Sequence, residues 1–313
     1  MNRKRKIVDV HLHLYDHRAN RHEFLESDDR MFRALIGDYS SLPRTYLLND
    51  YLADASDVEV EGVVWNEFLS TDPVKEVLWA QNLAEVAPLP VALVGLVDLT
   101  SPDLERVLDA YSQRSHLAAV RQHLGWDEQN PLRRFAPRGD LLADPRLLQG
   151  LRSLAKHNLK CSLEMFAPQI KDFRAVVEQN PDVSFWVAVM GWPLDLSKSG
   201  FAQWKEEMHA LSACPNVDVS VSALECVFGM DWAIADATPW IEALFESFGA
   251  ARIMFGSHRP ICKLSCSFPN PYRAYERFVE RLTASEQDAV FRKNAAAWFF
   301  GGMRERAKIA PAG

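Results

Sequence analysis

Two histidines near the start of the chain are spaced for joint chemistry. His11 and His13 end the apolar run Val8-Asp9-Val10-His11-Leu12-His13, which has the composition of a β-strand. Residues i and i+2 of a strand project to the same face, so both imidazoles can point at one centre. Such a pair suits a divalent-metal site or a proton-transfer site. Two surface histidines on a strand would have the same spacing. Whether the pair is functional therefore depends on the elements around it.

Short apolar runs alternate with helical patterns along the whole chain. Apolar residues at three- and four-residue spacing, such as Val74, Val77, Leu78 and Leu83, predict helices between the runs. A polar residue followed by proline predicts three helix starts, at Ser101-Pro102, Asp144-Pro145 and Thr238-Pro239. The runs themselves predict eight strands, at residues 7–10, 60–65, 91–97, 117–121, 161–166, 184–189, 217–222 and 252–255.

Eight strand and helix units in 313 residues, without a Gly/Ser-rich linker, favour a single α/β domain spanning 1–313. This number of units predicts a (β/α)8 TIM barrel. A doubly wound open sheet is the alternative, but no G-x-G-x-x-G turn follows the first strand. Residues 14–47 are too many for an ordinary connection after a strand, so we expect a long lid-like loop over the barrel mouth.

The composition narrows the class of partner. A formal net charge of −7 argues against nucleic acid, and the chain has no apolar run of the roughly 20 residues that a membrane helix needs. Five cysteines, an odd number in a long chain, predict reduced thiols and a cytoplasmic location rather than a disulfide framework. We therefore expect an enzyme with a small-molecule substrate and no membrane or nucleic-acid partner. A homo-oligomer stays open.

In a TIM barrel the catalytic groups lie at the carboxyl ends of the strands, so these ends can be inspected in turn. We expect many of their polar groups to converge on one mouth and about half to be ordinary loop residues. The candidates, in chain order, are His11 and His13, Asn66 and Glu67, Asp98, Arg121 and His123, Glu164, Trp192, Ser222 and Glu225, and His258 and Arg259.

Several motifs together resemble the amidohydrolase-2 branch of the amidohydrolase superfamily, which includes 2-pyrone-4,6-dicarboxylate lactonase and sugar lactonases. The resemblance implies a TIM-barrel hydrolase and covers nearly the whole chain. It rests on the His-x-His run and on Val120-Arg121-Gln122, Gly191-Trp192-Pro193, Asn216-Val217, Met254-Phe255-Gly256-Ser257 and Asn294-Ala295.

The chain departs from this family at two motif positions. Val189 stands where family members typically have a histidine that binds metal or substrate. His258, in Phe255-Gly256-Ser257-His258-Arg259-Pro260, stands where they typically have an aspartate that takes a proton from the attacking water and often contacts a metal. The loss of a carboxylate and the gain of an imidazole change both the charge and the ligand set of the site.

Two hydrolytic hypotheses follow. In the first, no metal is needed: His258 is the general base, since imidazole titrates near neutral pH, while His11 and His13 orient or polarise the carbonyl. In the second, His11, His13 and His258 hold one divalent metal, Zn²⁺ being the best match to three histidines. Glu164 or Glu67 would then supply the base. The expected substrate is a lactone, or a related ester or amide, of a small organic acid that could carry a carboxylate.

Two further hypotheses stay open: a barrel that has lost hydrolysis and serves as a ligand-binding or pathway-accessory protein, and a decarboxylase or isomerase. Five residues are expected to contact substrate. Arg121 could grip a carboxylate or form a salt bridge across the mouth, His123 could face the mouth or cap a loop, and Arg259 could lower the pKa of His258 or point to solvent. Glu164 and Trp192, the latter as a pocket wall, complete the set.

Overall fold

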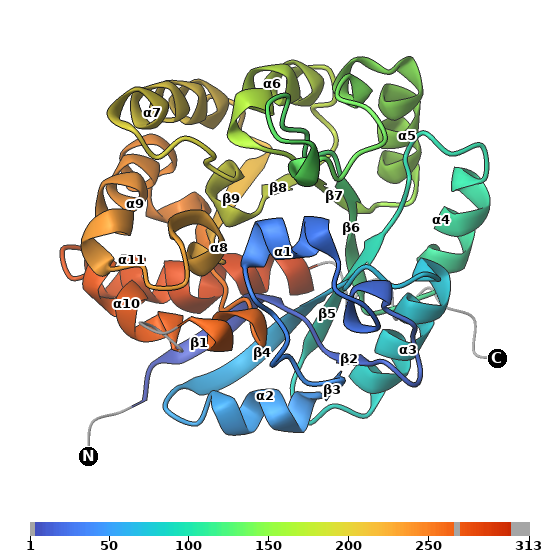
Figure 1. The fold of residues 1–313 in the computed structure, drawn as a ribbon, viewed down its shortest axis with the longest axis horizontal. Helices are drawn as coiled ribbons and strands as arrows, with labels where there is room; N and C mark the ends of the chain where they lie inside the picture. The colour runs from blue at the N-terminus through green and yellow to red at the C-terminus, as the bar shows by residue number, and fades with distance from the viewer. Residues whose placement is uncertain (1–3, 266–269, 302–313) are drawn as a thin grey trace.

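The computed structural model describes residues 4–265 and 270–301. Eight parallel strands form one sheet in which each strand pairs with the next along the chain, and a parallel bridge between Leu12 and Arg259 joins the last strand region to the first. The predicted TIM barrel and all eight predicted strands are confirmed (Figure 1). The strands are β1 (Lys6–Leu12), β4 (Glu59–Asn66), β5 (Val91–Leu96), β6 (Leu117–His123), β7 (Lys160–Glu164), β8 (Phe185–Val187), β9 (Val217–Val221) and β10 (Ile253–Phe255).

Helices surround these strands (Figure 1). The larger ones are α3 (Pro73–Glu85), α4 (Leu104–Ser112), α5 (Pro145–Lys156), α6 (Ile170–Glu178), α7 (Lys198–Ser212), α9 (Ile234–Phe248) and α10 (Pro271–Phe278). Shorter segments are α2 (Leu48–Asp54), α8 (Leu224–Phe228), α11 (Ala284–Asp288), η2 (Pro131–Arg133), η3 (Leu141–Ala143), η4 (Ala167–Gln169), η5 (Val189–Gly191), η6 (Ala250–Arg252) and η7 (Ile261–Leu264).

The three predicted helix starts fare differently. Asp144 caps α5 by accepting a hydrogen bond from the Arg146 amide, as predicted. The Ser101-Pro102 pair lies in the turn before α4, which begins at Leu104. The prediction at Thr238-Pro239 is wrong, because Pro239 lies inside α9, whose first turn begins at Ile234. There the Asp236 carboxylate accepts from the Ala233 amide and sets the earlier start.

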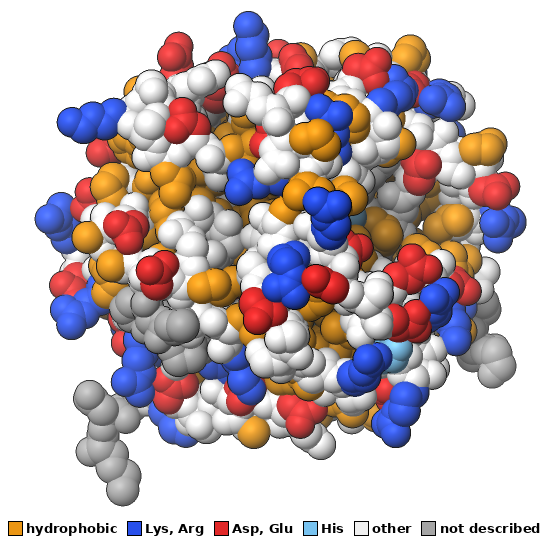
Figure 2. Space-filling model, viewed as in Figure 1, with side chains coloured by type: hydrophobic (Ala, Val, Ile, Leu, Met, Phe, Trp, Pro, Cys, Tyr) orange, Lys and Arg blue, Asp and Glu red, His pale blue; other side chains and the backbone are white. Residues whose placement is uncertain are grey.

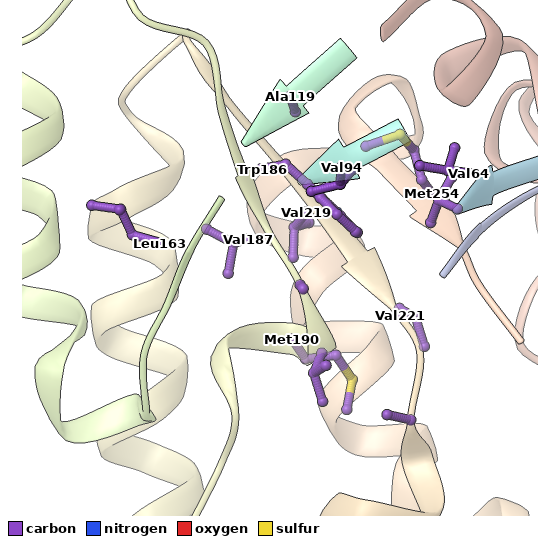
Figure 3. Packing of buried hydrophobic residues seen from close by; sticks show 14 of the residues in the cluster. Val64, Val94, Ala119, Leu163, Trp186, Val187, Met190, Val219, Val221 and Met254 are labelled. Carbon is purple, nitrogen blue, oxygen red and sulfur yellow. The ribbon is translucent and has the colours of Figure 1, made fainter. Parts of the chain in front are cut away.

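The strands are buried on both faces, because the barrel interior and the surrounding helices cover them. Val63, Val64 and Trp65 of β4, for example, are all fully buried. Figure 3 shows members of this core from several strands, among them Val64, Trp186 and Met254. Trp186 lies inside the barrel below the mouth, with its ring centroid 6.2 Å from that of His11 and 5.3 Å from that of Phe299. Aromatic rings therefore pack inside the barrel directly beneath His11.

The opposite end of the barrel is covered by two π-helical segments, η8 (Ala289–Lys293) and η9 (Ala296–Phe300). Between them, the Asn294 side chain donates to the carbonyl oxygens of Ala250 and Ile253, at 2.7 and 2.8 Å. Figure 2 shows charges of both signs interspersed over the face that Figure 1 presents. Among the described residues, no helix combines the length and the hydropathy that crossing a bilayer requires.

Residues 14–47, which we call the covering segment, have secondary structure of their own. A small antiparallel sheet joins β2 (Tyr15–Asp16) to β3 (Thr45–Tyr46), and η1 (Glu23–Leu25) and α1 (Arg30–Ile36) lie between them. In Figure 1, α1 lies in front of the barrel near the centre of the view. Phe24 packs against Phe32 and against Phe68 of the barrel, with centroids 4.1 and 5.0 Å apart. That the covering segment opens and closes as a lid stays a prediction.

Candidate active site

Three histidines from the two ends of the chain meet at the barrel mouth. His11 and His13 come from the end of β1, and His258 follows β10, the strand that completes the barrel. Their ring centroids are 4.7 to 5.4 Å apart, and one ligand atom from each lies within 4.8 Å of the others. The His258 amide donates to the His11 carbonyl oxygen at 2.6 Å. Closure of the barrel therefore brings the third imidazole to the other two.

Each imidazole is held from outside through its Nδ1 atom. His11 Nδ1 lies 2.8 Å from Ser222 Oγ, and His258 Nδ1 lies 2.7 Å from Glu225 Oε1. His13 Nδ1 lies 3.2 and 3.1 Å from the carbonyl oxygens of residues 66 and 67. Carbonyl and carboxylate oxygens only accept, so Nδ1 carries the proton in His13 and His258. In the neutral form of each ring, Nε2 keeps the lone pair.

Burial and mutual repulsion keep two of these imidazoles neutral. Burial, and after it repulsion from a protonated His258 and from Arg121, lowers the pKa of His13 to about 3. The same causes, burial first, hold the pKa of His11 well below its usual value. A neutral imidazole with a free Nε2 is the form that binds a metal or accepts a proton.

The three-histidine cluster fits a divalent metal in its donor set and in its outer contacts. Three neutral nitrogens are the protein ligands of open catalytic zinc sites. Ligating histidines commonly donate their second ring nitrogen to a carboxylate or carbonyl oxygen, as His258 and His13 do here. A second grouping, of Glu225, Cys226 and His258, fits less well. Burial raises the pKa of the Cys226 thiol well above its usual value, which disfavours the thiolate that binds metals.

Beside the histidines lies a buried network of two cations and two carboxylates. His123 Nε2 lies 2.8 Å from Glu67 Oε1, and His123 Nδ1 lies 2.9 Å from Glu164 Oε2. Arg121 Nη1 lies 3.5 and 3.6 Å from the same two carboxylates, and its Nη2 donates to Asn66 Oδ1 at 2.8 Å. Arg121 therefore forms the salt bridge across the mouth that the sequence left as one alternative. His123 faces the mouth.

The network keeps all of its members charged. Burial opposes protonation of His123, but the carboxylates of Glu67 and Glu164 outweigh it and raise its pKa to about 10. Burial likewise opposes ionisation of Glu67, but His123 and Arg121 lower its pKa to about 2. Arg121 and His123 outweigh burial at Glu164 too and lower its pKa. Both carboxylates are thus weak bases, which disfavours the prediction that Glu67 or Glu164 activates water.

Trp192 and Arg259 differ in their relation to the site. Trp192 lines the pocket, and its indole Nε1 donates to Glu164 Oε1 at 2.9 Å, in agreement with its expected place as a wall. The Arg259 side chain is buried away from the pocket lining, where Cys262, Tyr46 and Tyr51 are among the groups that act on its charge. Its backbone carbonyl accepts from the His13 amide at 2.8 Å. Arg259 thus contributes main chain to the site.

Several residues after the strands have a left-handed backbone. Seven non-glycine residues in the described part of the chain have positive φ, and six of them follow strands β4, β8, β9 or β10: Leu69, Val189, Met190, Trp192, Ala223 and His258. Such conformations cost free energy and cluster where a site needs a sharp corner. The β-branched Val189 adopts φ of 52° although it lacks the imidazole expected there. The sharp turn at residues 189–192 is therefore present without that histidine, and Trp192 at its end lines the pocket.

The cavity over the histidines is small, about 60 Å³. The mouth brings together every residue predicted to act in catalysis or to contact substrate except Arg259, since the cavity is lined by His11, His13, His258, Arg121, His123, Glu164 and Trp192. Phe32, Leu35 and Ile36 of the covering segment line it from above. Sequence inspection placed Ser222 and Glu225 at a strand end without a role. In the sequence, only their position at the end of a strand pointed to them. Their contacts with His11 and His258 are formed by the fold.

Comparison with known proteins now places the chain in a family. The family model Amidohydro_2, described as Amidohydrolase, matches residues 8–301, so this protein belongs to the amidohydrolase-2 family. The predicted resemblance is confirmed, and the protein is a hydrolase by family.

Relatives agree with this assignment. An uncharacterized protein of Sinorhizobium fredii is 28% identical over 295 residues, which are 94% of this chain and 98% of that protein. An L-fucono-1,5-lactonase of Burkholderia multivorans is 27% identical over 220 residues, 66% of this chain and 70% of the lactonase. The crystal structure of a Burkholderia multivorans amidohydrolase with bound Zn has a TM-score of 0.75 at 22% identity, and the match covers 94% of this chain and 99% of that one.

Proposed function

We propose that this protein hydrolyses a lactone, or a related ester or amide, of a small organic acid at one Zn²⁺ held by His11, His13 and His258. One observation carries the proposal: all three imidazoles are held through Nδ1, which directs their remaining nitrogens to a common centre at the pocket floor. The L-fucono-1,5-lactonase relative supports the lactone as the substrate class. The Zn-bound structural neighbour is similar in fold and agrees with the choice of metal.

Different residues of the pocket would have different roles in hydrolysis. When bound, Zn²⁺ would polarise the substrate carbonyl and lower the pKa of water. The protonated His123 lies at the pocket wall, where both of its N–H groups are bound by Glu67 and Glu164, and its positive charge can attract a substrate carboxylate or stabilise the departing alkoxide, which takes its proton from water. Arg121 adds positive charge close to the forming oxyanion, while Glu67 and Glu164 hold His123 and Arg121 in place. Phe32 and its neighbours in α1 exclude bulk water.

A metal-free route is the second candidate, and the Glu225 contact favours it. A carboxylate bound to Nδ1–H orients an imidazole and stabilises its protonated form, which is what a general base at His258 needs. Metal analysis separates the two routes. We expect about one equivalent of Zn²⁺ in the purified protein, lost on chelation together with hydrolysis of L-fucono-1,5-lactone and simpler δ-lactones, and restored by Zn²⁺ alone.

A His258→Ala variant completes this test, with Ser222→Ala as the milder control at the same site. Full turnover by metal-free protein would favour the second route, provided that His258→Ala abolishes it. Metal-loaded protein that opens none of these lactones would refute the proposed function and would favour the binding-protein or the decarboxylase and isomerase alternatives. Substrate-binding roles for Arg121, His123, Glu164 and Trp192, a cytoplasmic location, the absence of nucleic-acid and membrane partners, and a homo-oligomer remain part of the proposal.

A further inference from the structure

We infer that the substrate carries an apolar arm of several carbons, which binds in a second cavity beside the three-histidine pocket. The inference rests on the proposed function and specifies its substrate class. The cavity over the histidines, about 60 Å³, is small compared with the volumes typical of small-molecule sites. The second cavity measures about 550 Å³, a volume typical of small-molecule sites.

The two cavities adjoin. Leu69 and His123 line both of them, so a molecule whose carbonyl group reaches the histidines can extend past these two side chains. Leu69 follows β4 in a left-handed conformation, and His123 ends β6. The positively charged His123 thus lies at the junction, next to the point where the arm leaves the reacting group.

The lining of the second cavity suits an apolar ligand. Its walls come from α3, α4 and the connection after β6, and their apolar members include Pro73, Val74, Leu104, Val107, Phe135 and Leu141. Val74 is 37% exposed although it lies on the helix that packs against the barrel. Hydrophobic side chains are also visible on the surface near α3 and α4 (Figures 1 and 2). A concave apolar surface left open to water is a common mark of a binding site.

The inner polar groups of this cavity are already engaged. Gln122 Oε1 accepts from the Leu99 amide at 3.0 Å, and Gln122 Nε2 donates to Asp98 Oδ1 at 3.2 Å. Asp98 Oδ1 also accepts from the amide and hydroxyl of Thr100. A hydrocarbon chain leaves these bonds intact. Together with the apolar walls, this favours an alkyl or aryl arm.

Two δ-lactones with the same ring test the inference: δ-valerolactone, which has no arm, and δ-decalactone, which has a five-carbon arm. Burying each methylene is worth about fourfold in kcat/KM. We expect the zinc-loaded protein to prefer δ-decalactone by roughly 1000-fold when all five carbons are buried. Equal kcat/KM values for the two lactones would overturn the inference.

Substitutions in the wall of the second cavity provide a second test. Val74→Glu and Val107→Glu should raise KM for δ-decalactone about tenfold and should thereby reduce the preference for δ-decalactone over δ-valerolactone. Val86→Glu is the matched control, because Val86 ends the same helix, is 83% exposed and lines neither cavity. A preference for δ-decalactone that survives both wall substitutions would place the arm elsewhere and overturn the inference.

A binding measurement separates failure of the inference from failure of the proposed function. If neither lactone is opened, hydrolysis of lactones fails, and calorimetric titration with 1-octanol then tests the cavity alone. Binding of 1-octanol that Val107→Glu weakens, and Val86→Glu does not, supports the apolar subsite. No binding of 1-octanol to the unmodified protein overturns it.

Discussion

Glu225 Oε1 lies 2.7 Å from Nδ1 of His258, and both side chains are buried. The contact joins α8, which follows β9, to the corner after β10. A carboxyl group therefore lies one imidazole beyond position 258, where the family resemblance predicts an aspartate.

Loss of the Glu225 carboxylate should weaken metal binding more than folding. In Glu225→Gln we expect a 10- to 100-fold loss of Zn²⁺ affinity, the usual effect of removing an outer contact of a ligating histidine. Competition with a chromophoric chelator measures the affinity, and circular dichroism checks the fold. Glu246→Gln, a change to a partly exposed carboxylate on α9, is the control. Unchanged affinity in Glu225→Gln would show that His258 is not a ligand.

The His123 network should give a bell-shaped contribution to stability. The pKa of His123 is raised to about 10, so its contribution is complete below about pH 6.5 and falls as pH rises toward 10. The pKa of Glu67 is lowered to about 2, so its contribution is complete above about pH 4.5 and falls as pH drops toward 2. The difference in unfolding free energy between the wild type and His123→Gln should thus be largest between about pH 4.5 and 6.5. Urea denaturation at several pH values measures it, and a difference independent of pH would contradict the network.

A buried pair, His22 and Glu76, joins the covering segment to α3. Ionisation of this glutamate should lower the stability of the protein, whereas ionisation of Glu67 raises it. His22 Nε2 lies 3.2 Å from Glu76 Oε1, and burial raises the pKa of Glu76 to about 7. An acid with a raised pKa costs stability when it ionises, so the wild type should lose stability relative to Glu76→Gln as pH rises from about 4.5 through 7. Glu85→Gln, an exposed change at the end of the same helix, should show no such trend. Parallel curves for the wild type and Glu76→Gln would contradict this account.

Gly256 lets the chain after β10 approach β1 next to His258. A Cβ at this position would lie 2.5 Å from the His11 Cβ and 2.7 Å from the His11 backbone nitrogen. Gly256→Ala should therefore cost about 1–3 kcal/mol of unfolding free energy and reduce Zn²⁺ affinity, because His11 must move. Gly125→Ala is a milder comparison, since its Cβ would meet only the Phe166 ring, at 3.1 Å. Wild-type stability and affinity in Gly256→Ala would show that the corner can relax.

Local sequence determined the eight strands and the set of residues at their carboxyl ends. Runs such as Val91 to Leu96 are apolar at every position because both faces of a parallel strand are buried, and this pattern can be read without a structure. In a closed barrel these ends share one rim, so His11, His13 and His258 could be grouped from opposite ends of the chain.

Only the tertiary structure decided which groups these residues contact. Ser222 and its partner His11 are 211 positions apart, and no local pattern encodes their 2.8 Å contact. The use of Arg121 in a salt bridge, the burial of Arg259 away from the pocket and the second cavity beside His123 likewise depend on side-chain direction and on packing between distant segments. Period and composition specify an element and its buried face, whereas a site depends on how the faces of many elements meet.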